Sequence, residues 1–381
     1  MDALAAQQAS SQRHARTGFT VSPSERIILD AVRRHRSISR AALTVETDLS
    51  QQSVHRLVDQ LMERGLLVAG EAIRKGRGQP SPQIELVRTA AYAIGISVST
   101  DSMTLCLADF SGDILEEIRL RIPPLHRNAS LRALRDAMDR LVKRNSVDRA
   151  RIIGIGFTIS GFFVHGRKHV NAPAPLQDWS LTDLQTILES TFELPVWMEN
   201  DASSAAIGES ILGVGTWARN FFYLNFSYGF GGGVVLNGKP YFGSHGNAGE
   251  MMFDKEESRR RPALKFLIAE LRANGIDIDS IEDLRMRFDP QWPGVEPWIE
   301  RTLPALDRVI NTLAGLFDPD AIVFGGLLPP TLGNMLIERV QFWEHRNGVG
   351  PALPKLVLSE TNGDATVIGA AVMPLKNTFF L

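Results

Sequence analysis

The sequence predicts an α/β protein in two parts, a small helical head followed by a longer body of alternating strands and helices. Charge divides the chain in this way, because residues 1–90 carry 13 basic and 9 acidic side chains whereas the remainder carries 28 and 34. The spacing of apolar residues also changes, from helical up to Gly65 to strand-like from Ala90 onward. With 381 residues the chain is too long for the head alone, so the body is expected to form two lobes.

Composition narrows the class of protein further. No run of about 18 apolar residues is present, so no segment is expected to span a membrane. Residues 1–22 are polar and lack the apolar core of a signal peptide, which predicts a disordered arm. The single cysteine, Cys106, excludes an intramolecular disulfide and a multi-cysteine zinc site, and its apolar neighbours place it in a core strand. These features are typical of a cytoplasmic protein.

Three helices are predicted in the head. The first runs from Ser24 to His35, and a short second helix starts at Ser39. The third follows Ser50, a good N-cap, and ends before Gly65, where a left-handed C-cap costs little. Its apolar positions have the spacing of a helix packed on one face: Val54, Leu57, Val58, Leu61 and Met62.

The opposite face of the third helix carries short, uncharged or basic donors that can reach base edges. These residues are Ser50, Gln51, Gln52, Ser53, His55 and Arg56. Residues 66–68 and 84–87 can then pair as a hairpin with a basic tip that contains Arg74, Lys75, Arg77 and Gln79. An Arg flanked by Gly enters a narrow minor groove without obstruction. Residues 23–88 therefore predict a winged helix-turn-helix that binds double-stranded DNA, the alternative being a three-helix packing module with a solvated basic loop.

Strands alternate with helices in the body. Its first half has predicted strands at 92–98, 103–109, 114–122, 152–158 and 194–198, with a helix after the third and another starting at Asn200-Asp201. In the second half, strands at 221–226 and 234–236 flank a Gly-rich turn, and a buried strand at 321–324 ends at Gly325-Gly326. Residues 89–200 and 201–381 are the two predicted lobes, with a C-terminal helix that returns to the first.

Seven short motifs follow one another in a specific order between about Ser24 and Met373. They occupy residues 76–82, 93–95, 198–202, 229–233, 243–250, 317–326 and 368–371. In this order and spacing the chain resembles the ROK family (repressor, open reading frame, kinase), in its winged-helix repressor branch. The resemblance implies an actin/hexokinase-like (RNase H-like) body whose interlobe cleft binds a sugar.

The resemblance also implies a set of ligand-binding residues. Asn200 and Asp201 are either a plain N-cap or partners of sugar hydroxyls, and in the similar kinases the matching Asp is the general base. Glu250 occupies the family's Gly-Glu position. His245 lies on the same loop, where a lone His is equally often a turn residue. Ser160 and Gly161 match the loop that borders the sugar in relatives.

Two departures from the family bear on chemistry. ROK kinases begin with Asp-x-Gly-x-Thr, which handles the phosphates and metal of ATP, and the matching run here contains Ser97 and Ser99 instead of the Asp and Gly. The family's zinc site is missing, since Phe253 stands where its His would be and a charged, predicted helical stretch (254–274) replaces its cysteines. We therefore expect no catalytic residue, cofactor or bound metal.

The favoured hypothesis is a DNA-binding transcriptional regulator, a repressor of carbohydrate uptake or catabolism genes. A small carbohydrate or sugar-derived effector in the interlobe cleft would control it. We expect it to bind an inverted-repeat operator as a homodimer or homotetramer. A sugar kinase with a fused DNA-binding head and a regulator controlled by a protein partner remain as alternatives.

Overall fold

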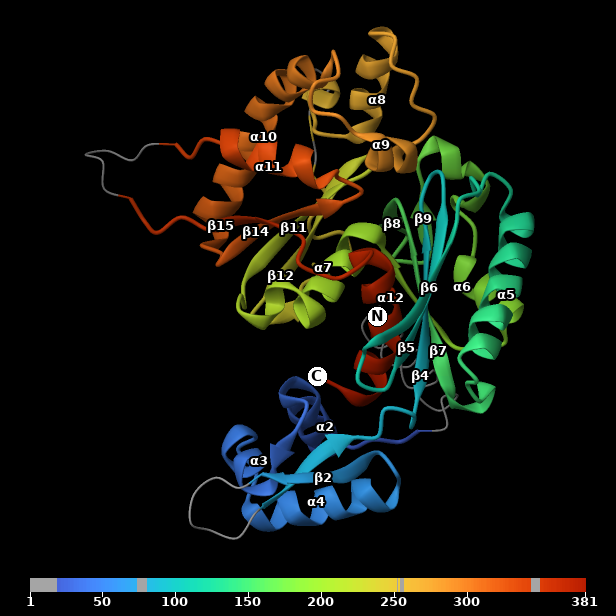
Figure 1. Cartoon of the computed structure of the whole chain (residues 1–381), viewed down its shortest axis with the longest axis vertical. Helices are drawn as coiled ribbons and strands as arrows, with labels where there is room; N and C mark the ends of the chain where they lie inside the picture. The colour runs from blue at the N-terminus through green and yellow to red at the C-terminus, as the bar shows by residue number, and fades with distance from the viewer. Residues whose placement is uncertain (1–18, 74–80, 252, 254–256, 344–349) are drawn as a thin grey trace.

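The computed structural model describes residues 19–73, 81–251, 253, 257–343 and 350–381. A small head lies at one end of a two-lobed body (Figure 1). The tip of the predicted wing and most of the predicted N-terminal arm lie outside the described residues. No helix of the described part is both long and apolar enough to cross a membrane.

The last residues of the predicted disordered arm are instead packed into the protein. The ring of Phe19 lies edge-on to that of Phe379, with 5.0 Å between their centroids. Val21 is partly buried against the core of the head. The prediction of disorder is therefore wrong for residues 19–22. It rested on the polar composition of the whole segment, which took no account of the two apolar side chains at its end.

The head is a winged helix. Its helices are α2 (Pro23–His35), α3 (Arg40–Glu46) and α4 (Gln51–Glu63), and its strands are β1 (Ile38–Ser39), β2 (Leu67–Ile73) and β3 (Ser81–Leu86) in the order β1-β3-β2. A serine caps each helix, since Ser22, Ser39 and Ser50 each accept a hydrogen bond from the backbone amide three residues later. Gly65 has a φ of +69°, as a left-handed C-cap requires. The first helix begins one residue earlier than predicted because Ser22 is its cap.

The first lobe is built on a five-stranded sheet of order β10-β7-β4-β5-β6. Helices α5 and α6 cover one face and α12 covers the other (Figure 1). The elements are β4 (Tyr92–Val98), β5 (Met103–Asp109), β6 (Ile114–Leu120), α5 (Arg127–Arg144), β7 (Ile152–Ile159), β8 (Phe162–Val164), β9 (His169–Asn171), α6 (Leu184–Phe192), β10 (Val196–Asn200) and α12 (Ala365–Phe379). Cys106 is fully buried on β5, as predicted, and donates to the carbonyl of Val367 in α12.

The second lobe has a five-stranded sheet of order β13-β12-β11-β14-β15, with α7 on one face. Helices α8, α10 and α11 share a hydrophobic core with its other face, and α9 joins them. The elements are α7 (Asp201–Leu212), β11 (Phe221–Phe226), β12 (Phe230–Leu236), β13 (Lys239–Pro240), α8 (Leu264–Ala273), α9 (Ile281–Arg287), α10 (Val295–Phe317), β14 (Ala321–Gly326), α11 (Pro330–Arg339) and β15 (Lys355–Leu358). Short 3₁₀ turns lie at Arg149–Arg151, Ala174–Trp179, Val214–Thr216 and Glu257–Arg259.

The Gly-rich run at residues 229–233 is mostly strand and only partly the predicted turn. β12 begins at Phe230, so the connection from β11 is confined to residues 227–229. A Cβ on Gly233 would overlap the carbonyl oxygen of Ala202 in α7. Gly233 therefore allows a helix to pack directly on the strand, which periodicity within the strand itself does not reveal.

Helix α12 contacts both lobes and the head. Where it crosses α7, a Cβ on Gly369 would overlap the carbonyl oxygen of Ser204, and the hydroxyl of Ser204 donates to Thr366 O at 2.8 Å. At its other end, Arg26 of α2 donates from Nε to Phe380 O and from Nη2 to Lys376 O, both at 2.9 Å. One helix thus joins the interlobe contact to the head.

Candidate functional site

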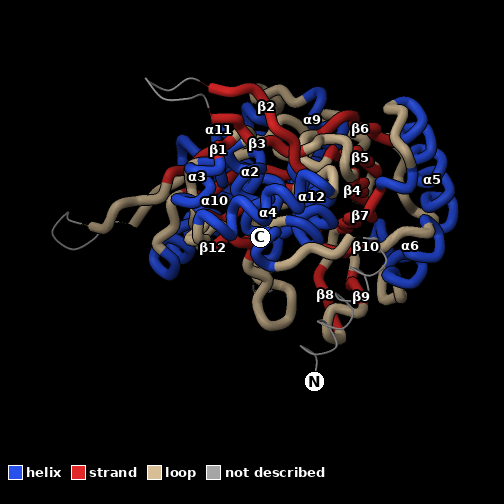
Figure 2. The backbone as a smooth tube through the Cα atoms, turned by 90° about the horizontal axis from the view of Figure 1, so that it is seen from below, coloured by secondary structure: helices blue, strands red, loops and turns tan. Residues whose placement is uncertain are grey.

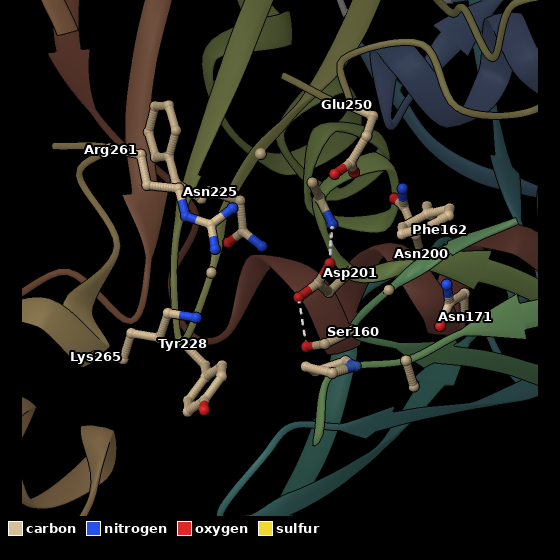
Figure 3. Close-up of a pocket in the computed structure, with 17 residues that line it drawn as sticks. Ser160, Phe162, Asn171, Asn200, Asp201, Asn225, Tyr228, Glu250, Arg261 and Lys265 are labelled. Atoms are coloured by element: carbon tan, nitrogen blue, oxygen red, sulfur yellow. Dashed lines mark hydrogen bonds between the residues drawn. The ribbon is translucent and has the colours of Figure 1, made fainter. Parts of the chain in front are cut away.

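A pocket of about 210 Å³ lies between the lobes, at the point where β10 ends and α7 begins. Its lining comes from β7 and the β8–β9 hairpin of the first lobe and from β11, β12 and the start of α8 in the second (Figure 3). Five of the six predicted ligand-binding residues line it: Ser160, Gly161, Asn200, Asp201 and Glu250.

Asn200 is the N-cap of α7. Its Oδ1 accepts a hydrogen bond of 2.7 Å from the backbone amide of Ser203, and the residue is buried. The N-cap interpretation is therefore correct for Asn200. Its side chain also lines the pocket, so capping and a contact with a ligand are not exclusive.

Asp201 is the first residue of α7 and points into the pocket (Figure 3). Its Oδ2 accepts a 2.7 Å hydrogen bond from Ser160 Oγ, and its Oδ1 accepts one of 2.9 Å from the amide of Ala202. Burial raises the pKa of the carboxyl, while hydrogen bonds from Ser160, Ala202 and Asn225 act in the opposite direction. A carboxylate has about four acceptor sites, so Asp201 can still accept from ligand hydroxyls.

Glu250 and His245 lie on one loop, but only Glu250 lines the pocket. Desolvation of the Glu250 carboxyl and the nearby charge of Asp201 raise its pKa, and Arg261 acts against them, although the side chain keeps an exposed surface. The structure does not bring His245 to this pocket, and its side chain is exposed on the loop. Asn247 ties that loop to the first lobe through two 2.8 Å hydrogen bonds with the backbone of Phe163.

Several lining residues are absent from the predicted set. They are Phe162, Asn171, Asn225, Tyr228, Arg261 and Lys265. Arg261 and Lys265 belong to the charged stretch that stands in place of the family's zinc segment, and only Leu264–Ala273 of that stretch is α-helical among the described residues. The basic run Arg259-Arg260-Arg261 is the one sequence signal that points to them.

The turn after β4 is joined to the second lobe. The carboxylate of Asp101 accepts from the amides of Ile281 at 2.7 Å and Glu282 at 3.3 Å, at the start of α9. Arg119 of β6 adds an ion pair of 2.7 Å to Glu282. This turn therefore binds protein groups of α9. No group of three or more His, Cys, Asp or Glu side chains placed to hold a metal occurs within the described residues.

The predicted DNA-contacting residues of α4 divide into two sets. Ser50 caps the helix and its hydroxyl donates to Ser53 Oγ at 2.9 Å, so both hydroxyls serve the local structure. The other four, Gln51, Gln52, His55 and Arg56, are exposed and do not cap the helix. Helix α4 lies along the side of the head that faces away from the body (Figures 1 and 2). Arg74, Lys75, Arg77 and Gln79 lie outside the described residues.

Comparisons with known proteins agree with the division of the chain into a winged-helix head and a two-lobed body. Residues 93–252 match the ROK family, and residues 19–78 match the MarR family. The chain is 27% identical over 364 residues to the uncharacterized protein y4fQ of Sinorhizobium fredii, which covers 94% of this chain and 92% of that protein. It is 28% identical over 233 residues to the xylose repressor of Bacillus spizizenii, covering 61% of this chain and 60% of that protein.

Solved structures show the same fold. A ROK family transcriptional regulator, described as a homolog of the Escherichia coli MLC protein, aligns over 96% of this chain and 98% of its own with a TM-score of 0.70 and 20% identity. The ROK hexokinase of Thermus thermophilus aligns with 74% of this chain and 97% of its own, with a TM-score of 0.55 and 23% identity. The body of this chain is therefore similar to the ROK family, and its winged-helix head is similar to the MarR family.

Proposed function

We propose that this protein is a DNA-binding transcriptional regulator, a repressor of carbohydrate uptake or catabolism genes controlled by a sugar or sugar-derived ligand. The observation that carries the proposal is that one chain holds both an exposed polar face on α4 and an interlobe pocket lined by hydrogen-bonding groups. The similarity to a xylose repressor supports a carbohydrate ligand.

The packing of α7 and α12 supplies a physical route between pocket and head. Asp201 starts α7, and α7 crosses α12 with close backbone contact at Gly369. The far end of α12 is held by Arg26 of α2. A ligand that displaces the start of α7 would therefore displace the head, provided that it binds the two arrangements with different affinity. Coupling of this kind is typically worth about 1–3 kcal/mol.

The form of the operator would follow from the symmetry of a homodimer. A two-fold homodimer would present two copies of α4 to an inverted repeat, with half-sites about one helical turn apart. A change in the position of each head relative to its body would alter the spacing of the two helices. Operator affinity would then depend on ligand without any change in the base contacts themselves.

We also propose that the protein has no kinase activity. Ser97 and Ser99 remove the carboxylate and the glycine of the phosphate motif, and Asp101 beside them is engaged with α9. The likeness to ROK kinases concerns the fold only. A coupled assay with ATP and a panel of hexoses should detect no turnover, and turnover that disappears in Asp201→Asn would overturn this part of the proposal.

An operator selected from a random DNA pool provides the test of regulation. Titration of the protein–operator complex with monosaccharides and their derivatives should identify a compound that changes operator affinity. Asp201→Ala should lose that response, with its operator affinity in the absence of ligand as the control for folding. Ser210→Ala, on the same helix but outside the pocket, should respond like the wild type. A normal response from Asp201→Ala would place the effector site elsewhere.

A further inference from the structure

The charged groups of the pocket lie on opposite walls. Asp201 and Glu250 occupy one side, and Arg261 and Lys265 face them from the loop before α8 and from the start of α8 (Figure 3). None of these four side chains is within ion-pair distance of another or of any other charged residue in the described part of the chain. The pocket thus holds two carboxylates and two cations without a salt bridge between them.

Arg261 lacks a partner for its guanidinium. Its Nε is buried and has no hydrogen-bond acceptor, and the guanidinium carbon lies 5.9 Å from the ring centre of Phe266. A buried N–H of a charged group without an acceptor is costly, and such groups in proteins are normally paired. A guanidinium presents paired N–H donors that match the oxygens of a carboxylate or phosphate.

Lys265 adds a second cation beside it. The ammonium lies 4.8 Å from the ring centre of Tyr228 and 5.2 Å from that of Phe266. Burial and the adjacent Arg261 lower its pKa. Lys265 is in the first turn of α8, whose N-terminus has no side-chain cap, so the helix dipole adds to the positive potential instead of offsetting it.

The carboxylates of the pocket do not fulfil the role of this missing partner. Asp201 is oriented by Ser160 and by the start of its own helix, on the far wall. Glu250 interacts with Arg261 only at long range, through the field that opposes the rise of its pKa. An anion placed between Arg261 and Lys265 would complete the hydrogen bonding of the guanidinium and reduce the repulsion between the two cations.

We infer that the ligand of this pocket is an acidic sugar, whose hydroxyls bind Ser160 and Asp201 while its carboxylate or phosphate binds Arg261 and Lys265. The inference rests on the proposed function and defines the chemical class of the effector. A neutral sugar would leave the buried Nε of Arg261 without an acceptor, so discrimination comes from that penalty as well as from the new contact. We expect an acidic sugar to bind about tenfold or more tightly than its neutral counterpart.

The full-length protein and three charge-removing variants test this inference. Arg261→Gln and Lys265→Gln keep hydrogen-bonding side chains of similar length, and Lys143→Gln removes an exposed cation of α5 as the matched control. Thermal stability is measured in phosphate, acetate and chloride at equal ionic strength. Binding of glucose, glucuronate and glucose 6-phosphate, and of galactose and galacturonate, is measured by calorimetry.

Phosphate or acetate should stabilise the wild type and Lys143→Gln more than chloride does, and the two pocket variants should lose that excess. A phosphate ligand is indicated if phosphate stabilises the protein more than acetate does and glucose 6-phosphate binds more tightly than the sugar acids. The opposite order indicates a carboxylate ligand. Equal binding of acidic and neutral sugars, or undiminished anion binding by both pocket variants, would overturn the inference. Regulation by a neutral sugar that depends on Asp201 would then still stand, whereas an unchanged ligand response in Asp201→Ala would refute the proposed function itself.

Discussion

Helices α4 and α7 begin in the same way but are surrounded differently. In α4 the side chain of Ser50 accepts from the amide of Ser53 at 3.2 Å, and in α7 that of Asn200 accepts from Ser203 at 2.7 Å. The helices have similar lengths, 13 and 12 residues. Yet α4 buries one face only, whereas every residue of α7 from Ala202 to Glu209 is buried. The exposed face of α4 can contact another large molecule, whereas α7 reaches the pocket only at its first residues and is otherwise enclosed by the elements packed around it.

The largest expected effect comes from the enclosed helix. Gly369→Ala should lower the free energy of unfolding by about 3 kcal/mol, at the upper end of overpacking effects, because the new Cβ would overlap the backbone of Ser204. Gly315→Ala in α10 is the control, since nothing lies within 4 Å of its Cβ position, and it should be neutral or stabilising by up to about 1 kcal/mol. Urea titration measures both. Equal stability of the two variants would mean that α7 and α12 are not closely packed.

The exposed face of α4 should respond in binding and not in stability. Gln52→Ala and Arg56→Ala should each weaken specific operator binding by about 1–3 kcal/mol if the side chain reads a base edge. Their free energies of unfolding should stay within about 0.5 kcal/mol of the wild type. Arg140→Ala, an exposed cation on α5, is the control for charge alone. Fluorescence anisotropy with the operator and with a scrambled duplex measures specific binding. Unchanged specific binding in both variants would contradict the assignment of this face of α4 to base contacts.

The link between the two regions is tested at Arg26. Arg26→Gln should remove the hydrogen bonds to Lys376 O and Phe380 O and so abolish the ligand-dependent shift in operator affinity, which is about 1–3 kcal/mol in typical systems. Arg36→Gln, which breaks the exposed 2.6 Å ion pair with Asp113, also loosens the head from the body and should keep the shift. If Arg36→Gln abolished the shift and Arg26→Gln kept it, the coupling would depend on the contact between Arg36 and Asp113 instead.

The two N-caps provide a smaller and more direct comparison. Ser50→Ala should cost about 1 kcal/mol of stability, because solvent can replace the lost hydrogen bond at an exposed helix end. Asn200→Ala should cost more, about 2 kcal/mol, because the amide of Ser203 then lies in the interior without an acceptor. Thermal unfolding of both variants in the absence of ligand measures the difference. Equal costs would show that water reaches the start of α7.

The smallest effects concern the pH dependence of stability. Burial raises the pKa of Asp201, so its ionisation destabilises the folded protein as pH rises from the unfolded pKa through the folded one. Asp201→Asn should therefore lose less stability than the wild type between acid and neutral pH. A hydrogen bond from Arg40 lowers the pKa of the exposed Asp59 on α4, so Asp59→Asn should remove a small stabilisation that is lost as pH falls. Parallel pH profiles for all three proteins would contradict both assignments.

Local signals in the sequence were sufficient for much of the fold. The cap at Ser50, the left-handed turn at Gly65 and the strands at residues 92–98 and 103–109 all lie where predicted. Each depends on neighbouring residues: a side chain three positions from an amide, a glycine after a helix, or a run of apolar residues. The position of Asp201 at a strand-to-helix junction was predictable for the same reason.

The sequence by itself thus determined the elements and placed Asp201 at the head of α7, while the tertiary structure decided what surrounds them. It left His245 outside the pocket and fixed the loop after β13 to the first lobe, through a contact between Asn247 and Phe163, which are far apart in the chain. It also brought Arg261 and Lys265 to face Asp201 across the pocket. Capping and periodicity are short-range properties, whereas the partners of a charge in a cleft depend on how segments far apart in the chain are packed together.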